Sequence, residues 1–271
     1  MSWPGLMILA LTFSSADHSP CAAIPGATAI LSDHSIKTIV VGEFHGTTET
    51  PVVFEDLTCL AASSGRRVVV ALEHPTTEQP QIDEFIASDG GPAALQALIS
   101  SAEWHTPFPD GRTSAARLTL LRQLREMVRA KKVARVIAIM PTARLSSSKY
   151  EKAMATNVLN AGHENELVLA LVGNVHALLV PWKSSPGISY LPMAANLPRA
   201  ATKTLNATGN GGSAWVCMPA CGSHGFGPAR TSYSRGIRLV GLGEKSYDGF
   251  LHLGVPTTAS LPASRIISPP R

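Results

Sequence analysis

The sequence predicts an α/β fold with a largely parallel central sheet flanked by helices, and with antiparallel or edge strands added in the C-terminal third. Apolar, β-branched segments such as "KTIVVGE" and "ELVLALVG" alternate with amphipathic segments between residues 37 and 176. Such alternation is typical of a parallel sheet covered by helices. After Pro181 the apolar segments become short and are separated by Gly, Pro and Ser clusters, which indicates hairpins and edge strands.

The first strand, helix and second strand form a βαβ unit. Residues 37–43 are an apolar run that ends at a glycine and a glutamate, as expected for a strand buried on both faces. Thr50 and Pro51 predict the start of a helix, because proline is favoured at the first helical position, and Gly65 predicts its end. The second buried strand is expected over residues 67–73, parallel to the first.

The following segments continue the alternation of helices and strands. Two short helices are expected within residues 78–100, separated at Gly90-Gly91-Pro92. Residues 113–132 predict an amphipathic helix with leucines on its inner face, and its arginines Arg122, Arg125 and Arg129 are expected to face solvent. A strand is expected at 134–141, a helix at 147–161 and a fourth strand within 166–177. The strand-like pieces beyond Pro181 are "ISYLPM", "RAATKTL", "SAWVCMP" and "GIRLVGL".

Length and composition limit the possible classes of function. The chain has 271 residues, of which 45% are hydrophobic and 15% charged, so residues 24–271 are expected to form a single domain around one core. Its net charge is +4, and its Lys and Arg are dispersed, which disfavours nucleic-acid binding. No Gly-x-Ser-x-Gly, P-loop or Gly-x-Gly-x-x-Gly motif occurs, which disfavours a serine-hydrolase triad and a nucleotide site.

Residues 1–23 resemble a signal peptide. The apolar block from Leu6 to Phe13 is far shorter than the roughly 20 residues of a membrane span, so no transmembrane segment is expected. Small residues at 14–16 or 21–23 offer cleavage sites, although no Lys or Arg occurs before Lys37. The sequence thus predicts export to the periplasm or secretion, with a disordered N-terminus as the alternative.

The four cysteines fit an exported protein. Cys217 and Cys221 are close enough in sequence to form a disulfide. The alternative, a zinc site from this pair and His224, matches no common zinc spacing. Cys59 lies in an apolar helical stretch and is expected to be a packed thiol.

Polar side chains follow three of the predicted strands where each strand ends. They are Glu43 and His45, Glu73 and His74, and Asn174 and His176. Because parallel strands deliver their carboxyl ends to one edge of the sheet, we expect these residues to line a cleft there. Glu43 and His45 share a face if the chain stays extended, whereas only one of the adjacent pair Glu73 and His74 is expected to face the cleft.

This set of residues favours hydrolytic chemistry. His45 is the predicted general base, since its unperturbed pKa of about 6.5 is tuned by a nearby carboxylate, and Glu43 or Glu73 would orient it or hold water. His45, Glu73 and His176 could equally bind a divalent metal. His74 and Asn174 are expected beside a small-molecule or peptide substrate. The alternative for each single residue is an ordinary capping role at the end of a strand.

Six segments together resemble one known superfamily. They are "VGEFHGTTETP", "ALEHP", "DGRTS", "YEKAMATN", "GNVHA" and "YDGFLHLGVPTTASLP", and they span roughly residues 37 to 263. In this order they resemble the erythromycin esterases, the ChaN-like haem-binding proteins and the Tiki-type proteases. The resemblance implies a mixed sheet flanked by helices, with an active edge built from Glu43, His45, Glu73 and His176. Arg112 of "DGRTS" would lie at this edge and clamp an anionic group.

The resemblance implies several functions. Esterases of this superfamily use such a histidine to activate water against a lactone, whereas Tiki-like members bind a divalent metal at equivalent positions for peptide hydrolysis. ChaN-like members bind haem. We therefore expect a hydrolase of ester, lactone or peptide substrates, with a divalent metal as a possible cofactor. The alternatives are haem or iron binding without catalysis, and an inactive relative that kept the fold.

Overall fold

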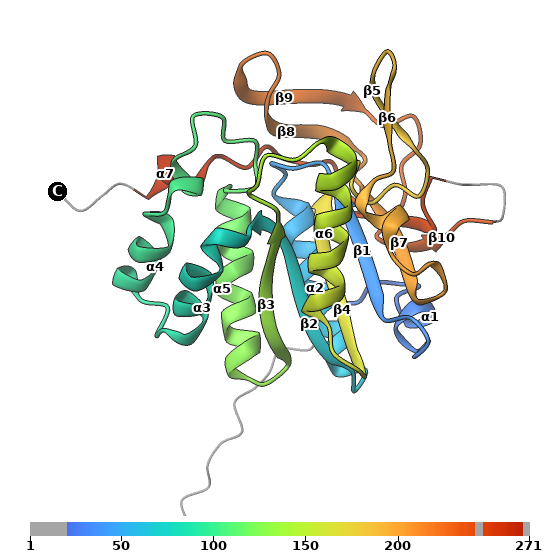
Figure 1. Cartoon of the computed structure of the whole chain (residues 1–271), viewed down its shortest axis with the longest axis horizontal. Helices are drawn as coiled ribbons and strands as arrows, with labels where there is room; N and C mark the ends of the chain where they lie inside the picture. Colours follow the sequence, from blue (N-terminus) through green and yellow to red (C-terminus); the bar gives the residue numbers. More distant parts are fainter. Residues whose placement is uncertain (1–20, 242–245, 268–271) are drawn as a thin grey trace, which may run out of the picture.

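A seven-stranded sheet forms the centre of the computed structural model, which describes residues 21–241 and 246–267. The strand order is β10-β11-β7-β1-β4-β2-β3 (Figure 1). Neighbouring strands are parallel throughout, except that β10 and β11 are antiparallel. The predicted α/β class, with a largely parallel sheet and an antiparallel edge from the C-terminal third, is therefore confirmed.

The central strands are buried on both faces. All residues of β1 and β4 are buried, and so are those of β2 apart from Arg67. Because neither face of these strands meets water, their sequences are continuous apolar runs. The strands of the sheet are β1 (Thr38–Glu43), β2 (Arg67–Pro75), β3 (Val133–Met140), β4 (Glu166–Gly173), β7 (Thr202–Thr208), β10 (Gly236–Leu239) and β11 (Gly249–His252).

Helices pack on both faces of the sheet (Figure 1). Ile39 and Val41 of β1 belong to the apolar core shared with one group of helices, whereas Val40 belongs to the core shared with α6 on the other face. The first group comprises α2 (Glu49–Ser63), α3 (Gln79–Ala87), α4 (Pro92–Ile99) and α5 (Ala115–Arg129), and α6 is Ser147–Ala161. The remaining helices are short: α1 (Thr28–Leu31), α7 (Ala263–Ile266), η1 (Thr76–Glu78), η2 (Ala102–His105), η3 (Met193–Asn196) and η4 (Arg199–Ala201).

Helix α5 departs from its prediction at one arginine. Arg122 and Arg129 are exposed as expected, but Arg125 is buried. Its guanidinium donates a hydrogen bond of 2.9 Å from Nε to the carbonyl oxygen of Ser88. The prediction was wrong because the connection between α3 and α4 lies over this side of α5, which helical periodicity alone does not reveal.

Two hairpins rise above the edge of the sheet at which the parallel strands end (Figure 1). They are β5 (Trp182–Ser185) with β6 (Ile188–Tyr190), and β8 (Gly211–Cys217) with β9 (Cys221–Pro228). Of these, β6 and β8 coincide with predicted strand-like pieces. Strand β9 was not predicted, because "CGSHGFGP" is rich in glycine and lacks β-branched residues.

All four cysteines form disulfides. Cys217 pairs with Cys221 and joins β8 to β9, as predicted. Cys59 pairs with Cys21, which corrects its prediction as a packed thiol. The partner lies 38 residues away in sequence, so only the tertiary structure reveals it. Apart from residues 21–23, the predicted signal peptide lies outside the described residues.

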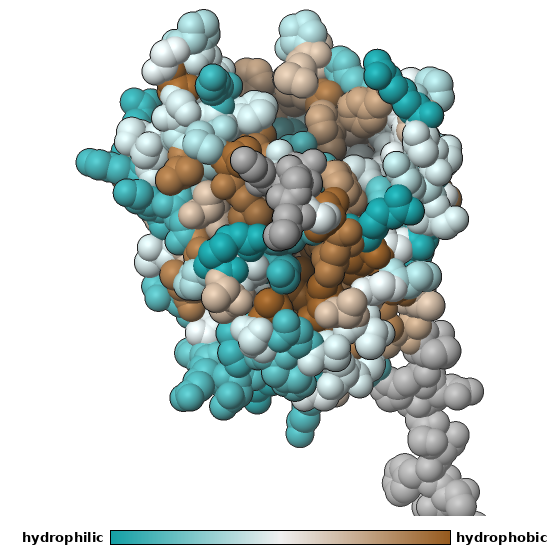
Figure 2. Space-filling view, turned by 90° about the vertical axis from the view of Figure 1, so that its right-hand side faces the viewer, coloured by the Kyte–Doolittle hydropathy of each residue, from teal (hydrophilic) through white to brown (hydrophobic). Residues whose placement is uncertain are grey.

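The β10 end of the sheet forms one side of the molecule. Figure 2 shows hydrophobic side chains gathered near the middle of this side, with polar side chains around them. Within residues 21–241 and 246–267, no helix combines the length and the hydrophobicity that crossing a membrane requires.

Candidate functional site

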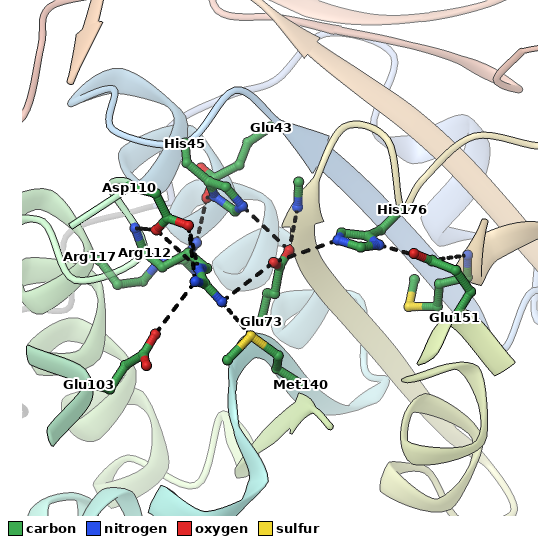
Figure 3. Close-up of polar contacts among 12 residues, drawn as sticks. Glu43, His45, Glu73, Glu103, Asp110, Arg112, Arg117, Met140, Glu151 and His176 are labelled. Atoms are coloured by element: carbon green, nitrogen blue, oxygen red, sulfur yellow. Dashed lines mark hydrogen bonds and ion pairs between the residues drawn. The ribbon is translucent and has the colours of Figure 1, made fainter. Parts of the chain in front are cut away.

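The carboxyl ends of β1, β2 and β4 bring Glu43, His45, Glu73 and His176 together (Figure 3). The carboxylate of Glu73 lies in the middle. Nε2 of His45 is 3.4 Å from Glu73 Oε2, and Nε2 of His176 is 3.7 Å from Glu73 Oε1. The side chains of both histidines keep some exposure, 17% and 19% respectively, so solvent and small molecules reach the imidazoles.

Gly173, the last residue of β4, lies between these side chains. A Cβ atom at this position would be 3.0 Å from Nε2 of His45 and 3.5 Å from Oε2 of Glu73. It would also be 3.6 Å from Cδ2 of His176. The glycine therefore leaves the space in which side chains from three strand ends meet.

Each imidazole is held by a second carboxylate through its other nitrogen. Nδ1 of His45 is 2.9 Å from Glu43 Oε1, and Nδ1 of His176 is 2.9 Å from Glu151 Oε2. Both anchoring carboxylates are buried. Because Nδ1 is used in this way, both rings are oriented with Nε2 toward Glu73. The result is an alternating row of carboxylates and imidazoles, with Glu73 at its centre.

The three buried carboxylates of this row have further hydrogen-bond partners. Glu43 accepts from the guanidinium of Arg117 on α5. Glu73 accepts from the backbone N–H of Gly173 at 2.6 Å. Glu151 accepts from the backbone N–H of Met193 at 2.7 Å. These partners offset the cost of burying charge at the end of the sheet.

Arg112 completes the site on the other side of Glu73. One terminal guanidinium nitrogen is 3.9 Å from Glu73 Oε1, and the other is 3.7 Å from Glu103 Oε1. Its Nε donates to both carboxylate oxygens of Asp110 at 3.0 Å, and the guanidinium also contacts the sulfur of Met140. The side chain keeps 19% exposure. All three nitrogens of this partly exposed cation thus face protein groups, among them the carboxylates of Glu73, Glu103 and Asp110.

The charges of this cluster shift its pKa values strongly. Burial alone would lower the pKa of His45, but the carboxylates of Glu73 and Glu43 outweigh it and raise the pKa to about 10. Burial likewise opposes protonation of His176, yet Glu73 and Glu151 raise its pKa. Burial disfavours the ionised form of Glu73, but His45, His176 and Arg112 hold its pKa well below the usual range. At neutral pH, therefore, the ionised Glu73 faces a protonated His45 on one side, and on the other side a His176 whose protonated form is favoured.

Of the two predicted substrate contacts, His74 lies away from the site, and Asn174 is held at the site's edge by backbone hydrogen bonds. His74 is buried on the opposite side of β2, where its Nε2 is 2.8 Å from Glu78 Oε2 and its ring is 5.9 Å from that of Trp104. Glu73 alone of the adjacent pair thus faces the site. Asn174 contributes its backbone: its N–H donates to the carbonyl oxygen of Glu43, and its carbonyl oxygen accepts from the hydroxyl of Tyr247.

Sequence reasoning missed two residues of the site, Arg117 and Glu151. Arg117 lies at helical spacing from the leucines Leu121 and Leu124, on the inner face of α5. A charged residue on an apolar face was the signal that could have found it. Glu151 lies within the quoted segment "YEKAMATN", and nothing in that segment shows that its carboxylate meets His176.

The predicted metal ligands do not form a ligand set in this arrangement. Across the part of the chain that the structure describes, no group of three or more His, Cys, Asp or Glu side chains is placed to hold a metal ion. Both Nδ1 atoms are engaged by carboxylates, and both Nε2 atoms point at Glu73. The metal site at His45, Glu73 and His176 stays a prediction, and so does haem binding.

The architecture is that of an α/β protein whose fold is similar to that of an erythromycin esterase. In solved structures, this fold is shared with a mutant of the erythromycin esterase EreC in its open conformation. The TM-score is 0.63 at 10% identity, over 87% of this chain and 93% of that chain. A succinoglycan biosynthesis protein is similar, with a TM-score of 0.61 at 8% identity over 86% of this chain and 91% of that one. The fold expected from the resemblance is therefore confirmed.

Other comparisons are less informative. A bacterial protein toxin aligns with a TM-score of 0.47 and 19% identity, and the chain spans 37% of the toxin's length. No family model matches the chain, and no curated protein matches its sequence. The similarity to known proteins thus extends to the fold alone.

Proposed function

We propose that this protein is a hydrolase in which His45 activates water and His176 protonates the leaving group of an ester, lactone or peptide. One observation carries the proposal. The imidazoles of His45 and His176 are each anchored at Nδ1 by a carboxylate of their own. Both present Nε2 to the carboxylate of Glu73, at distances of 3.4 and 3.7 Å. A base and an acid on either side of one small space suit attack by water followed by departure of a leaving group.

The reaction would proceed with a balanced transfer of protons. A water held by Glu73 loses a proton to Nε2 of His45 as its oxygen bonds to the substrate carbonyl carbon. Glu43 stabilises the imidazolium that forms. Arg112 stabilises the negative charge that develops on the carbonyl oxygen. The bond to the leaving group then breaks, and the leaving group takes the proton from Nε2 of His176.

The resting charge state sets a condition on this reaction. His45 accepts a proton only when it is neutral, and its pKa of about 10 keeps it protonated at neutral pH in the ligand-free site. Loss of this proton would therefore limit turnover by the free enzyme. We expect kcat/KM to rise with pH as His45 loses its proton and to fall where His176 loses the proton that it donates, because kcat/KM reports the pKa values of the free enzyme.

Matched histidine variants test the proposal. We would compare the wild type with His45→Gln, His176→Gln and the control His105→Gln, whose side chain is exposed on η2 away from the row. Panels of esters, lactones and peptides would be assayed with chelator and with added divalent ions. We expect losses of about a hundredfold or more for the first two variants and none for the control. Absence of wild-type turnover in every panel and ion condition would end the hydrolase proposal.

We also propose that the protein is exported. The pairs Cys21–Cys59 and Cys217–Cys221 support this, since disulfides persist in oxidising compartments. A mature chain that keeps the first disulfide must be cleaved before Cys21, so cleavage at residues 14–16 is favoured over 21–23. Mass spectrometry of the mature N-terminus would test this, and cleavage after residue 23 would contradict it.

A further inference from the structure

An apolar cavity of about 320 Å³ adjoins the loop that carries His45. This volume is within the range of small-molecule pockets. Its walls come from the loop after β1, the end of β7, the base of the β8–β9 hairpin and the segment after β11. The lining includes Phe44, Thr47, Thr208, Phe226, Ala229 and Thr257.

The walls of the cavity offer carbon atoms to a ligand. The lining consists of Phe, Thr, Ala, Gly, Pro and Leu residues. Its threonine hydroxyls are engaged within the protein: Thr47 donates to the hydroxyl of Thr50 at 2.8 Å, and Thr257 donates to the carbonyl oxygen of Gly211 at 3.2 Å. The hydroxyl of Thr208 is 3.0 Å from Nδ1 of His252. The cavity therefore suits a hydrocarbon group.

The cavity is fixed in position relative to His45. The carbonyl oxygen of Gly46, the residue after His45, accepts from the backbone N–H of Trp215 on β8 at 2.9 Å. Gly46 has φ +78°, and a Cβ there would lie 2.1 Å from the carbonyl oxygen of Trp215, so only glycine fits. Phe44, the residue before His45, contacts Phe226 of β9 edge to face, with ring centroids 4.8 Å apart. The loop of His45 and the hairpin thus form one unit at the rim of the cavity.

We propose that this cavity is the subsite for an aliphatic acyl chain of several carbons, whose ester, lactone or amide bond is placed at His45. The proposal rests on the proposed function and names its substrate class. The apolar lining selects the chain, and the link to the imidazole is that Phe44 and Thr47 of the lining belong to the same loop as His45. A hydrocarbon chain is favoured because burying it costs no hydrogen bond in a lining whose hydroxyls are engaged.

Binding of straight-chain carboxylates tests the subsite without requiring turnover. Calorimetric titrations from acetate to octanoate would use the wild type and His45→Gln. We expect the affinity of both proteins to increase by about fourfold for each added methylene until the cavity is full. In the wild type, kcat/KM for esters of the same acids should increase in parallel with chain length.

Two substitutions in the cavity and one control locate the effect. Ala229→Phe fills the cavity, and Phe226→Ala removes the aromatic ring at its rim. Ala220→Phe adds the same side chain as the first variant at an exposed position in the turn of the hairpin. We expect Ala229→Phe to abolish the dependence of affinity on chain length. Phe226→Ala should weaken octanoate binding about tenfold, and Ala220→Phe should bind all the carboxylates as the wild type does.

The outcomes separate this inference from the proposed function. Binding that depends on chain length, in a protein that hydrolyses no ester, would support the subsite and overturn the hydrolase. Equal affinities for acetate and octanoate would overturn the subsite, even in an active hydrolase. Octanoate binding that survives both Ala229→Phe and Phe226→Ala unchanged would overturn it as well.

Discussion

Nε2 of His45 and Oε2 of Glu73 lie 3.4 Å apart, although the strands that carry them are not neighbours in the sheet. Strand β4 runs between β1 and β2 and ends at Gly173, which has no side chain. The imidazole and the carboxylate meet over this glycine. The missing Cβ and the order of the strands therefore create the site together.

Glu73 should control the pH dependence of activity. Its carboxylate raises the pKa of His45, and only neutral His45 accepts a proton, so the charge of Glu73 moves the active form to higher pH. In Glu73→Gln the amide oxygen still accepts from Gly173, but the negative charge is gone. We expect the alkaline rise of kcat/KM to move to lower pH, toward the ordinary histidine pKa of about 6.5.

The measurement is a pH profile of kcat/KM for the wild type, Glu73→Gln and the control Glu164→Gln, whose side chain is exposed beyond α6. The control should follow the wild type. An unchanged position of the alkaline rise in Glu73→Gln would show that His45 is not the group whose deprotonation permits turnover.

Gly173→Ala should reduce activity while the protein stays folded. The added Cβ would lie 3.0 Å from Nε2 of His45, so the imidazole must move by a few tenths of an ångström. Small displacements of reacting groups are costly, and we expect kcat/KM to fall by about tenfold to a hundredfold. The control is Gly241→Ala, because a Cβ at that glycine meets no atom within 4 Å. Full activity in folded Gly173→Ala would mean that the space above β4 is not used.

Arg117 should matter for stability as well as for orienting His45. It is buried and pairs with Glu43, so Arg117→Met removes one of the two cations beside that buried carboxylate and leaves it to His45. Such a change costs about 3–5 kcal/mol in the free energy of unfolding, measured by denaturant titration. The double variant Arg117→Met/Glu43→Gln should recover part of this loss, because the group that lost its arginine is then neutral.

Arg122→Met provides the control on the same helix, since Arg122 is exposed. We expect it to change the unfolding free energy by less than about 0.5 kcal/mol. Strictly additive losses in the double variant would contradict a direct ion pair between the guanidinium and the carboxylate.

The two disulfides should differ in their contribution to stability. Cys21–Cys59 spans 38 residues and Cys217–Cys221 spans 4. In the chain-entropy model these loops correspond to about 4 and about 2 kcal/mol respectively. Paired Cys→Ser replacement at each bridge, followed by denaturant unfolding, would measure both. A larger loss from the shorter loop would contradict the entropic account.

The hydrophobic periodicity of the sequence was enough to predict the central strands and most helices. Continuous apolar runs such as β1 and β4 are buried on both faces, so their composition reflects burial directly. The hairpin strand β9 was missed because its stability comes from pairing with β8 and from the disulfide, not from its own residues. Arg125 was misplaced because a loop distant from its own helix covers it.

For the candidate site, the residues at the strand ends were visible in the sequence, because parallel strands send their carboxyl ends to one edge. Glu43, His45, Glu73 and His176 follow from that rule, and Arg112 from a family resemblance. Helix residues such as Glu151 and Arg117 obey no such rule, since the partner of a side chain on a helix depends on how that helix packs.

By itself, the amino-acid sequence determined the α/β class, the parallel core and the edge at which polar groups gather. These follow from local hydrophobic pattern and from the common direction of the strands. Only the tertiary structure decided that Glu73 lies between two imidazoles, that Cys21 meets Cys59 and that a cavity opens beside Phe44. Each of these depends on contacts between segments distant in sequence, and such contacts are fixed by strand order and helix packing.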